Sequence, residues 1–259
     1  MREINLSTKE LLVLASHVGA GNFYGIKDPF CGMSRQEIEA AIPSIQLALE
    51  QKGYASVGFD STFQINSDVK NTVSVCAQCD KYIMVDMISA GARTPKEMLY
   101  FSTGHCIKLT QSDAGVSLSE TTPESFVDRL LETVFQSYSD NAYDTGSITL
   151  SKTVLDVAKK KSLEDSKLFL QSHGCSPAIA SIITEGLHQL CTTLSLVAVD
   201  LNDHTLEALI CIVSQSASVS MRLDDLGAQD NWCVNWLSHK EFEKELRQIV
   251  SVPDCRGVG

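Results

Sequence analysis

The chain has 259 residues, of which 44% are hydrophobic, and a formal net charge of −11. This length and apolar content suffice for a folded domain with a sizeable core, which excludes a disulfide-stapled miniprotein and a wholly disordered chain. The acidic charge argues against nucleic acid as the main partner, because a phosphate backbone requires a basic surface. The densest basic run, Lys159–Lys161, is typical of a solvated helix end.

The first half of the sequence predicts helices, then an antiparallel meander, then one more helix. Capping boxes at Ser7–Glu10 and Ser34–Glu37 open two amphipathic patterns, and Pro43 is expected to interrupt or kink the second. Short alternating runs separated by turn residues predict strands, and a proline-started helix begins at residue 123. The expected helices cover 7–18, 34–52 and 66–76, and the expected strands 82–88, 98–101, 106–109 and 116–118.

The second half repeats this order of elements after a polar connector at 136–147. A strand-like tip leads into a helix that ends near residue 158, and two more helices follow. The strands then return, and the capping box Ser238–Glu241 opens a last helix. The expected helices include 162–171 and one that starts at 176, and the expected strands are 191–200, 205–213, 217–223 and 233–237.

The two halves are similar in sequence as well as in order. Ile4–Ala15 parallels Ile148–Ala158, and Val116–Ser119 parallels Val234–Ser238. We therefore predict an α+β fold of quasi-two-fold duplicated helix–meander–helix units that share a central sheet and are flanked by helical bundles; a chance recurrence is the alternative. The predicted organisation is an N-terminal half at 1–135, the connector at 136–147 and a pseudo-repeat at 148–259, together forming one domain.

No catalytic or metal-binding constellation emerges from the sequence. Cys76 and Cys79 form the CxxC pair, but no second pair completes a zinc site, so two core cysteines are expected. The glycines at 19–25 are interpreted as a helix stop, and Asp224, Asp225 and Asp230 as a solvated turn. We expect no enzyme activity, no cofactor and no metal, with redox chemistry at the CxxC pair as a competing hypothesis.

The nine scattered cysteines and the absence of an apolar leader predict a reducing, cytoplasmic location. No apolar run is long enough to insert in a membrane.

One arrangement suggests a different function. The helices at 7–18 and 34–52, with the residues trailing to 57, resemble a winged-helix element, so a DNA-binding regulator is the alternative function. Glu37, Glu39 and Glu50 on the second helix would repel phosphates.

Three segments resemble the EspG family of cytosolic type VII secretion chaperones. They are Leu6–Ala15 (LSTKELLVLA), Leu47–Tyr54 (LALEQKGY) and the meander before Thr122–Phe126 (TPESF). The cysteine content and the Lys- and Ile-rich helices are more typical of a low-GC Gram-positive, non-mycobacterial relative.

The resemblance implies a quasi-two-fold α+β chaperone that binds the apolar tip of a helical-hairpin secretion substrate of the WXG, LXG or PE/PPE type. It implies delivery to a secretion ATPase, no nucleic-acid partner, and a monomer or weak dimer. Contacts are expected at the turn Gly91, Ala92, Arg93 and Thr94 and on the helices at 151–188. Ile179, Ile182 and Ile183 are expected to belong to the core instead.

Overall fold

The computed structural model describes residues 3–20, 23–59, 62–89, 91–102, 104–135, 147–214, 218–223 and 231–251. In this part of the chain, eight helices and thirteen strands form two compact units. Unit 1 comprises Met1–Tyr82, Glu97–Thr122 and Asp200–Asp203, and unit 2 comprises Ile83–Lys96, Pro123–Val199 and His204–Gly259. Division of the sequence at 136–147 remains a prediction, and residues 136–146 of that connector lie outside the described residues.

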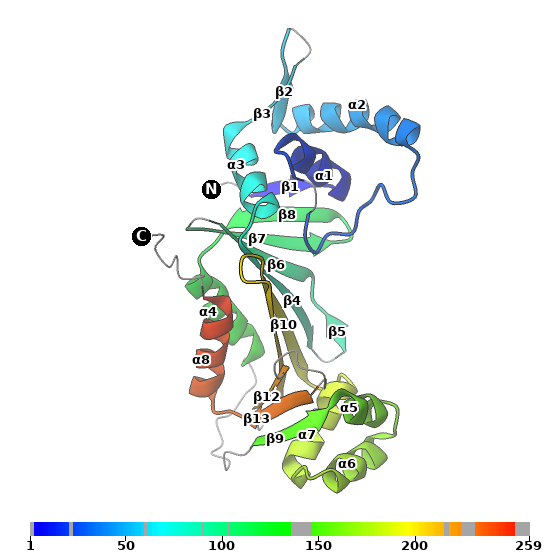
Figure 1. Cartoon of the computed structure of the whole chain (residues 1–259), viewed down its shortest axis with the longest axis vertical. Coiled ribbons are helices and arrows are strands. Elements are labelled where there is room, and N and C mark those ends of the chain that lie inside the picture. The colour runs from blue at the N-terminus through cyan, green and yellow to red at the C-terminus, as the bar shows by residue number, and fades with distance from the viewer. Residues whose placement is uncertain are drawn as a thin grey trace. The chain divides into compact units, whose positions relative to one another are not determined.

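Unit 1 contains three helices and most of the first meander (Figure 1). The capping boxes of Ser7 with Glu10 and of Ser34 with Glu37 are both formed, which confirms two predicted helix starts. The second helix continues through Pro43, because one missing backbone N–H does not outweigh the turns on either side. The elements are β1 (Ile4–Leu6), α1 (Thr8–His17), α2 (Arg35–Gln51), β2 (Ala55–Val57), β3 (Phe63–Ile65), α3 (Ser67–Ala77), β6 (Lys96–Ser102), β7 (His105–Ser112) and β8 (Gly115–Glu120).

The strands of unit 1 follow the order β1-β8-β7-β6, and the pairs β1–β8 and β7–β8 are antiparallel. Helix α1 contacts β8 and helix α3 contacts β7, so both helices cover this sheet. The side chains of Leu11, Leu14 and Val73 are fully buried there. The β2–β3 hairpin, which the sequence patterns did not predict, projects from the unit beside α2 (Figure 1).

Unit 2 contains the remaining elements, with strand order β4-β10-β11-β12-β13-β9 and the short β5 paired to β4. The pairs β11–β12, β12–β13 and β13–β9 are antiparallel. The elements are β4 (Lys81–Ser89), β5 (Ala92–Arg93), α4 (Pro123–Val134), β9 (Ser147–Ser151), α5 (Lys152–Lys159), α6 (Leu163–Ser172), α7 (Pro177–Leu187), β10 (Thr192–Asp200), β11 (Thr205–Val213), β12 (Ser218–Leu223), β13 (Asn231–Trp236) and α8 (His239–Val250).

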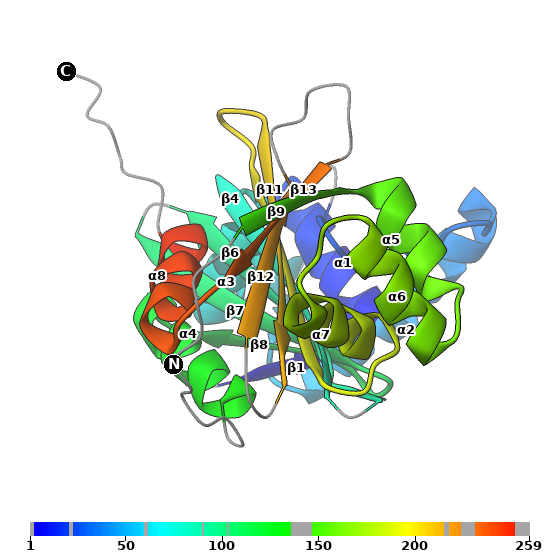
Figure 2. The same cartoon turned by 90° about the horizontal axis from the view of Figure 1, so that it is seen from below.

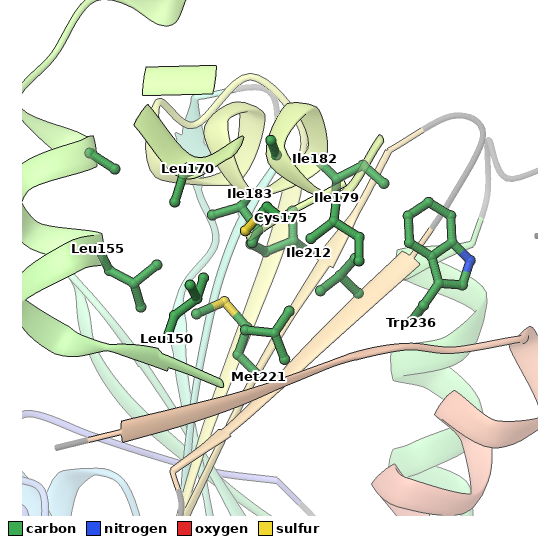
Figure 3. Close-up of a cluster of buried hydrophobic side chains, with 14 residues drawn as sticks. Leu150, Leu155, Leu170, Cys175, Ile179, Ile182, Ile183, Ile212, Met221 and Trp236 are labelled. Carbon is green, nitrogen blue, oxygen red and sulfur yellow. The ribbon is translucent and has the colours of Figure 1, made fainter. Parts of the chain in front are cut away.

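The helices α5, α6 and α7 lie together (Figure 2) and pack on the sheet through one apolar cluster. Figure 3 shows Ile182 and Ile183 of α7 above Ile212 of β11 and Met221 of β12. Ile179, Ile182 and Ile183 are between 0% and 9% exposed, so their predicted place in the core is confirmed.

The last helices of the two halves, α4 and α8, pack against each other (Figure 1). Arg247 on α8 donates to Asp128 on α4 at 2.6 Å and to Glu243 on its own helix at 2.8 Å. The rings of Phe135 and Phe242 meet edge to face at 4.9 Å. These contacts explain why α4 groups with the C-terminal elements in unit 2.

Strand pairing repeats at residue level between the two halves. In the first half Asn5 pairs with Ser117, and Asn5 lies two residues before Ser7, which caps α1. In the second half Thr149 pairs with Cys233, and Thr149 lies two residues before Ser151, which caps α5. The strand-like tips are thus β1 and β9, and the predicted α+β class, antiparallel strands and repeated order of elements are confirmed.

We expect Gly186→Ala to destabilise unit 2 by about 1–2 kcal/mol, because overpacking a filled core outweighs the better helix propensity of alanine. A Cβ atom on Gly186 would lie 2.6–2.9 Å from three side-chain carbons of Ile212. Urea titration of the free energy of unfolding tests this. In an Ile212→Ala background the Gly186→Ala step should cost less, because the truncated side chain leaves room for the added methyl group. A more stable single variant would contradict the packing argument.

Candidate functional site

The predicted contact residues 91–94 form the end of a short hairpin. Gly91 adopts φ +79°, and Ala92 and Arg93 pair with Ser89 and Ile88 of β4. The backbone N–H and the hydroxyl of Thr94 both donate to the carbonyl of Met87, at 3.0 and 3.2 Å. Thr94 is therefore tied to Met87 by both its backbone and its hydroxyl.

Arg93 is the one charged side chain among these four residues. Its guanidinium contacts the carboxylate of Asp86 at 2.9 Å, and 67% of the side chain is exposed. A guanidinium has five N–H donors, so Arg93 can bind Asp86 and still donate to carbonyl or carboxylate oxygens of a partner. This geometry suits the predicted rim contact, which remains a prediction.

The helices α5–α7, also predicted to contact a partner, expose apolar side chains away from the core. Serines at 151, 162 and 176 cap the three helices, so the sequence sets the start of each one. On α6, Leu170 is fully buried whereas Leu168 is 63% exposed. Val157 and Leu163 are 38% and 40% exposed. We call Val157, Leu163 and Leu168 together the α5–α6 apolar surface; Leu163 and Leu168, five residues apart, lie on different sides of α6.

The sequence patterns missed this surface, although they contained a signal for it. Leu168 falls outside the register of the buried residues Ser166 and Leu170 on α6. Singly exposed apolar residues are common on protein surfaces, so Leu168 is a candidate for a partner contact only because these helices are predicted to contact one. A second exposed set in unit 1 was also missed: Leu47 on α2, and Val57 and Phe59 in the β2–β3 hairpin.

The charges near the α5–α6 apolar surface are mostly lysines. Lys159 and Lys160 are exposed at the end of α5. Lys161 lies 5.0 Å from the ring centre of Phe169, and Lys167 lies 3.6 Å from Glu164. Since the whole chain is acidic, this segment could attract an acidic rim on a partner.

The CxxC pair lies in the core of unit 1. Cys76 is fully buried and Cys79 is 7% exposed, and both are free thiols. Burial raises the pKa of Cys79 to about 12 and also raises the pKa of Cys76. The thiols stay protonated near neutral pH and are weak nucleophiles, which supports their interpretation as core residues.

Among the described residues, no group of His, Cys, Asp and Glu side chains could hold a metal ion. Asp224, Asp225 and Asp230 lie outside those residues. No helix in the described part of the chain is long and apolar enough to cross a membrane.

The winged-helix interpretation receives little support from charge. α1, α2 and the β2–β3 hairpin follow one another as that interpretation requires. However, Arg35 pairs with Glu39 and Lys52 pairs with Glu10, each at 2.7 Å. The cations at both ends of α2 are thus neutralised by carboxylates, which leaves no basic face on α2 for DNA.

A buried carboxyl in unit 2 gives a pH-dependent stability. Glu245 on α8 lies beside Ser220 and Arg222 of β12, and its Oε2 atom is buried without a partner among the described residues. Burial raises the pKa of Glu245, opposed by the nearby hydroxyl of Ser220 and the charge of Arg222. The folded state therefore binds this proton more tightly than the unfolded state, and the resulting stability is lost as the pH rises through the raised pKa.

We expect Glu245→Gln to stabilise the protein near neutral pH by roughly 0.5–1 kcal/mol, a figure reduced for partial solvent screening. The variant and the wild type should converge below the ordinary glutamate pKa, where Glu245 is protonated in both states. Thermal unfolding across an acid-to-neutral pH series measures the difference. An equal gain at every pH would show that ionisation is not its cause.

Comparison with known proteins finds a likeness among solved structures. No protein-family model matches the chain, and no curated protein matches its sequence. Among solved structures, the fold is similar to that of the Mycobacterium tuberculosis type VII secretion system chaperone EspG5, whose structure was determined in complex with a PE25–PPE41 dimer. The TM-score is 0.67 with 11% sequence identity, and the match covers 98% of each chain. At this identity the likeness establishes a shared fold.

Proposed function

We propose that this protein is a non-enzymatic cytoplasmic chaperone or adaptor for a helical-hairpin protein destined for type VII secretion. The observation that carries the proposal is the fold likeness to a type VII secretion chaperone over 98% of both chains. That chaperone was seen with a PE25–PPE41 dimer. By analogy, the substrate proposed here is a PE/PPE-, WXG- or LXG-type protein that is handed on to a secretion ATPase.

The physical need for such a chaperone is clear. An amphipathic hairpin exposes an apolar patch that self-associates in water, and a complementary apolar surface keeps it soluble. The α5–α6 apolar surface supplies exposed leucines on rigid capped helices. The 91–94 turn supplies the exposed Arg93 guanidinium for polar contacts at the rim.

Co-expression with helical-hairpin proteins encoded beside this gene tests the proposal. A stable, co-purifying complex is expected with at least one of them, and failure with every such neighbour would refute it. Leu163→Ser combined with Leu168→Ser should weaken the complex and lower the melting temperature only slightly, since the two side chains are 40% and 63% exposed. Leu206→Ser, at an exposed leucine of β11 that belongs to neither exposed set, is the matched control.

A further inference from the structure

The outer edge of β9 is an unpaired strand edge. In unit 2, β9 is the last strand of the order and pairs with β13 on one side. Within the described residues no strand lies on its other side. Thr149 in the middle of β9 has an exposed side chain, and the strand carries no charged residue and no proline. Exposed edge strands usually carry a charged residue or a proline that prevents pairing with other chains, and β9 has neither.

The equivalent strand in the first half shows which backbone groups face outward. The N–H of Asn5 in β1 donates to the hydroxyl of Tyr54 at 3.0 Å, and its carbonyl accepts from Nζ of Lys52 at 3.3 Å. These groups thus point away from β8. Because Thr149 has the same register on β13 as Asn5 has on β8, its N–H and C=O point away from β13.

The side chains that close the edge of β1 have no counterpart at β9. The turn Lys52–Tyr54 after α2 corresponds to His173–Cys175 after α6, with a positive-φ glycine in the middle of each. His173 instead uses Nδ1 at 2.8 Å from the carbonyl of Phe169 on its own helix. Cys175 is buried and too short to reach the strand edge as the Tyr54 hydroxyl does. The edge of β1 is closed, whereas no side chain among the described residues closes that of β9.

We propose that β9 pairs antiparallel with β9 of a second copy of this chain, with the two Thr149 residues opposite each other. The strand reads Ser147-Ile-Thr-Leu-Ser151, a self-complementary pattern about Thr149. Two-fold pairing places Ile148 of one copy opposite Leu150 of the other, and Ser147 opposite Ser151. Leu150 belongs to the apolar cluster of unit 2 and Ile148 packs against it, so both clusters would continue across the interface. The two Thr149 residues would exchange two backbone hydrogen bonds.

The size of this contact predicts a weak dimer. Five residues a side are far fewer than the roughly 20–30 a side of a stable interface. Each copy also carries a net charge of −11, so the two copies repel each other at low ionic strength. Dimerisation should therefore depend on protein concentration and become stronger with added salt.

Sedimentation equilibrium of the full chain, from low to high micromolar concentration and at two salt concentrations, tests the proposal. We expect a monomer–dimer equilibrium for the wild type. Thr149→Lys should weaken it by about tenfold or more, because two ammonium groups would then face each other across the symmetry axis. Thr149→Pro should abolish the dimer, because it removes the outward N–H donor of residue 149 in each copy. It removes no hydrogen bond to β13. Thr153→Lys adds the same charge on exposed α5 and should leave the dimer intact.

Amide hydrogen exchange gives a readout that does not depend on these variants folding normally. Residues 147–151 of the wild type should become more protected as protein concentration rises. A wild type that stays monomeric throughout, or a dimer that survives Thr149→Lys, would overturn the proposal. Neither result bears on the proposed chaperone function, since substrate binding is measured separately and uses other residues.

Discussion

Leu170→Ala is expected to lower the free energy of unfolding by about 3 kcal/mol, as large-to-small changes in a packed core do. Leu170 is fully buried in the cluster of unit 2, where Figure 3 shows it between α6 and α7, near Cys175 and Ile183. The removed methyl groups leave a cavity that capped, mutually packed helices cannot easily close. Urea denaturation followed by circular dichroism measures the loss.

Leu168→Ala is the matched control on the same helix. The residue type and the helix are the same, but Leu168 is 63% exposed. Its truncation should change stability by less than about 0.5 kcal/mol, as is usual for surface positions. If the two variants lost equal stability, the assignment of buried and exposed faces of α6 would be wrong, and with it the α5–α6 apolar surface.

Local signals explain why much of the fold could be predicted. The capping boxes at Ser7, Ser34 and Ser238 involve residues three apart, so the sequence alone specifies them. The strand run at 205–213 matches β11 at both ends. The helix predicted at 34–52 is present, but an interruption at Pro43 is not found: the cost of proline is local, whereas the packing of Ile45 and Leu49 that compensates for it is tertiary.

Contacts between distant residues explain what the sequence could not show. Arg247 and Asp128 are 119 residues apart, yet their ion pair joins α4 to α8. The compact units therefore do not coincide with the repeated halves. The candidate turn at 91–94 came from a family resemblance, and only the structure shows Asp86 beside Arg93. Exposure of Leu163 and Leu168 likewise depends on how α5, α6 and α7 pack.

Lys52→Met is expected to lower the free energy of unfolding by about 2 kcal/mol, because it leaves a buried carboxylate without its cation. Glu10, with 6% of its side chain exposed, accepts from Nζ of Lys52 at 2.7 Å. Removing one partner of a fully buried ion pair costs about 3–5 kcal/mol. The loss for Lys52→Met should be smaller, because Lys52 is 40% exposed and Ser7 still donates its N–H to Glu10.

A double-mutant cycle with Glu10→Gln separates the ion pair from simple loss of packing. Glutamine keeps an oxygen that can accept from the N–H of Ser7 but carries no charge, so the double variant should be more stable than Lys52→Met alone. High salt should reduce the coupling in part, since 40% of the Lys52 side chain is exposed whereas Glu10 is buried. A coupling energy near zero in chemical denaturation would show that the contact between α1 and α2 depends on apolar packing alone.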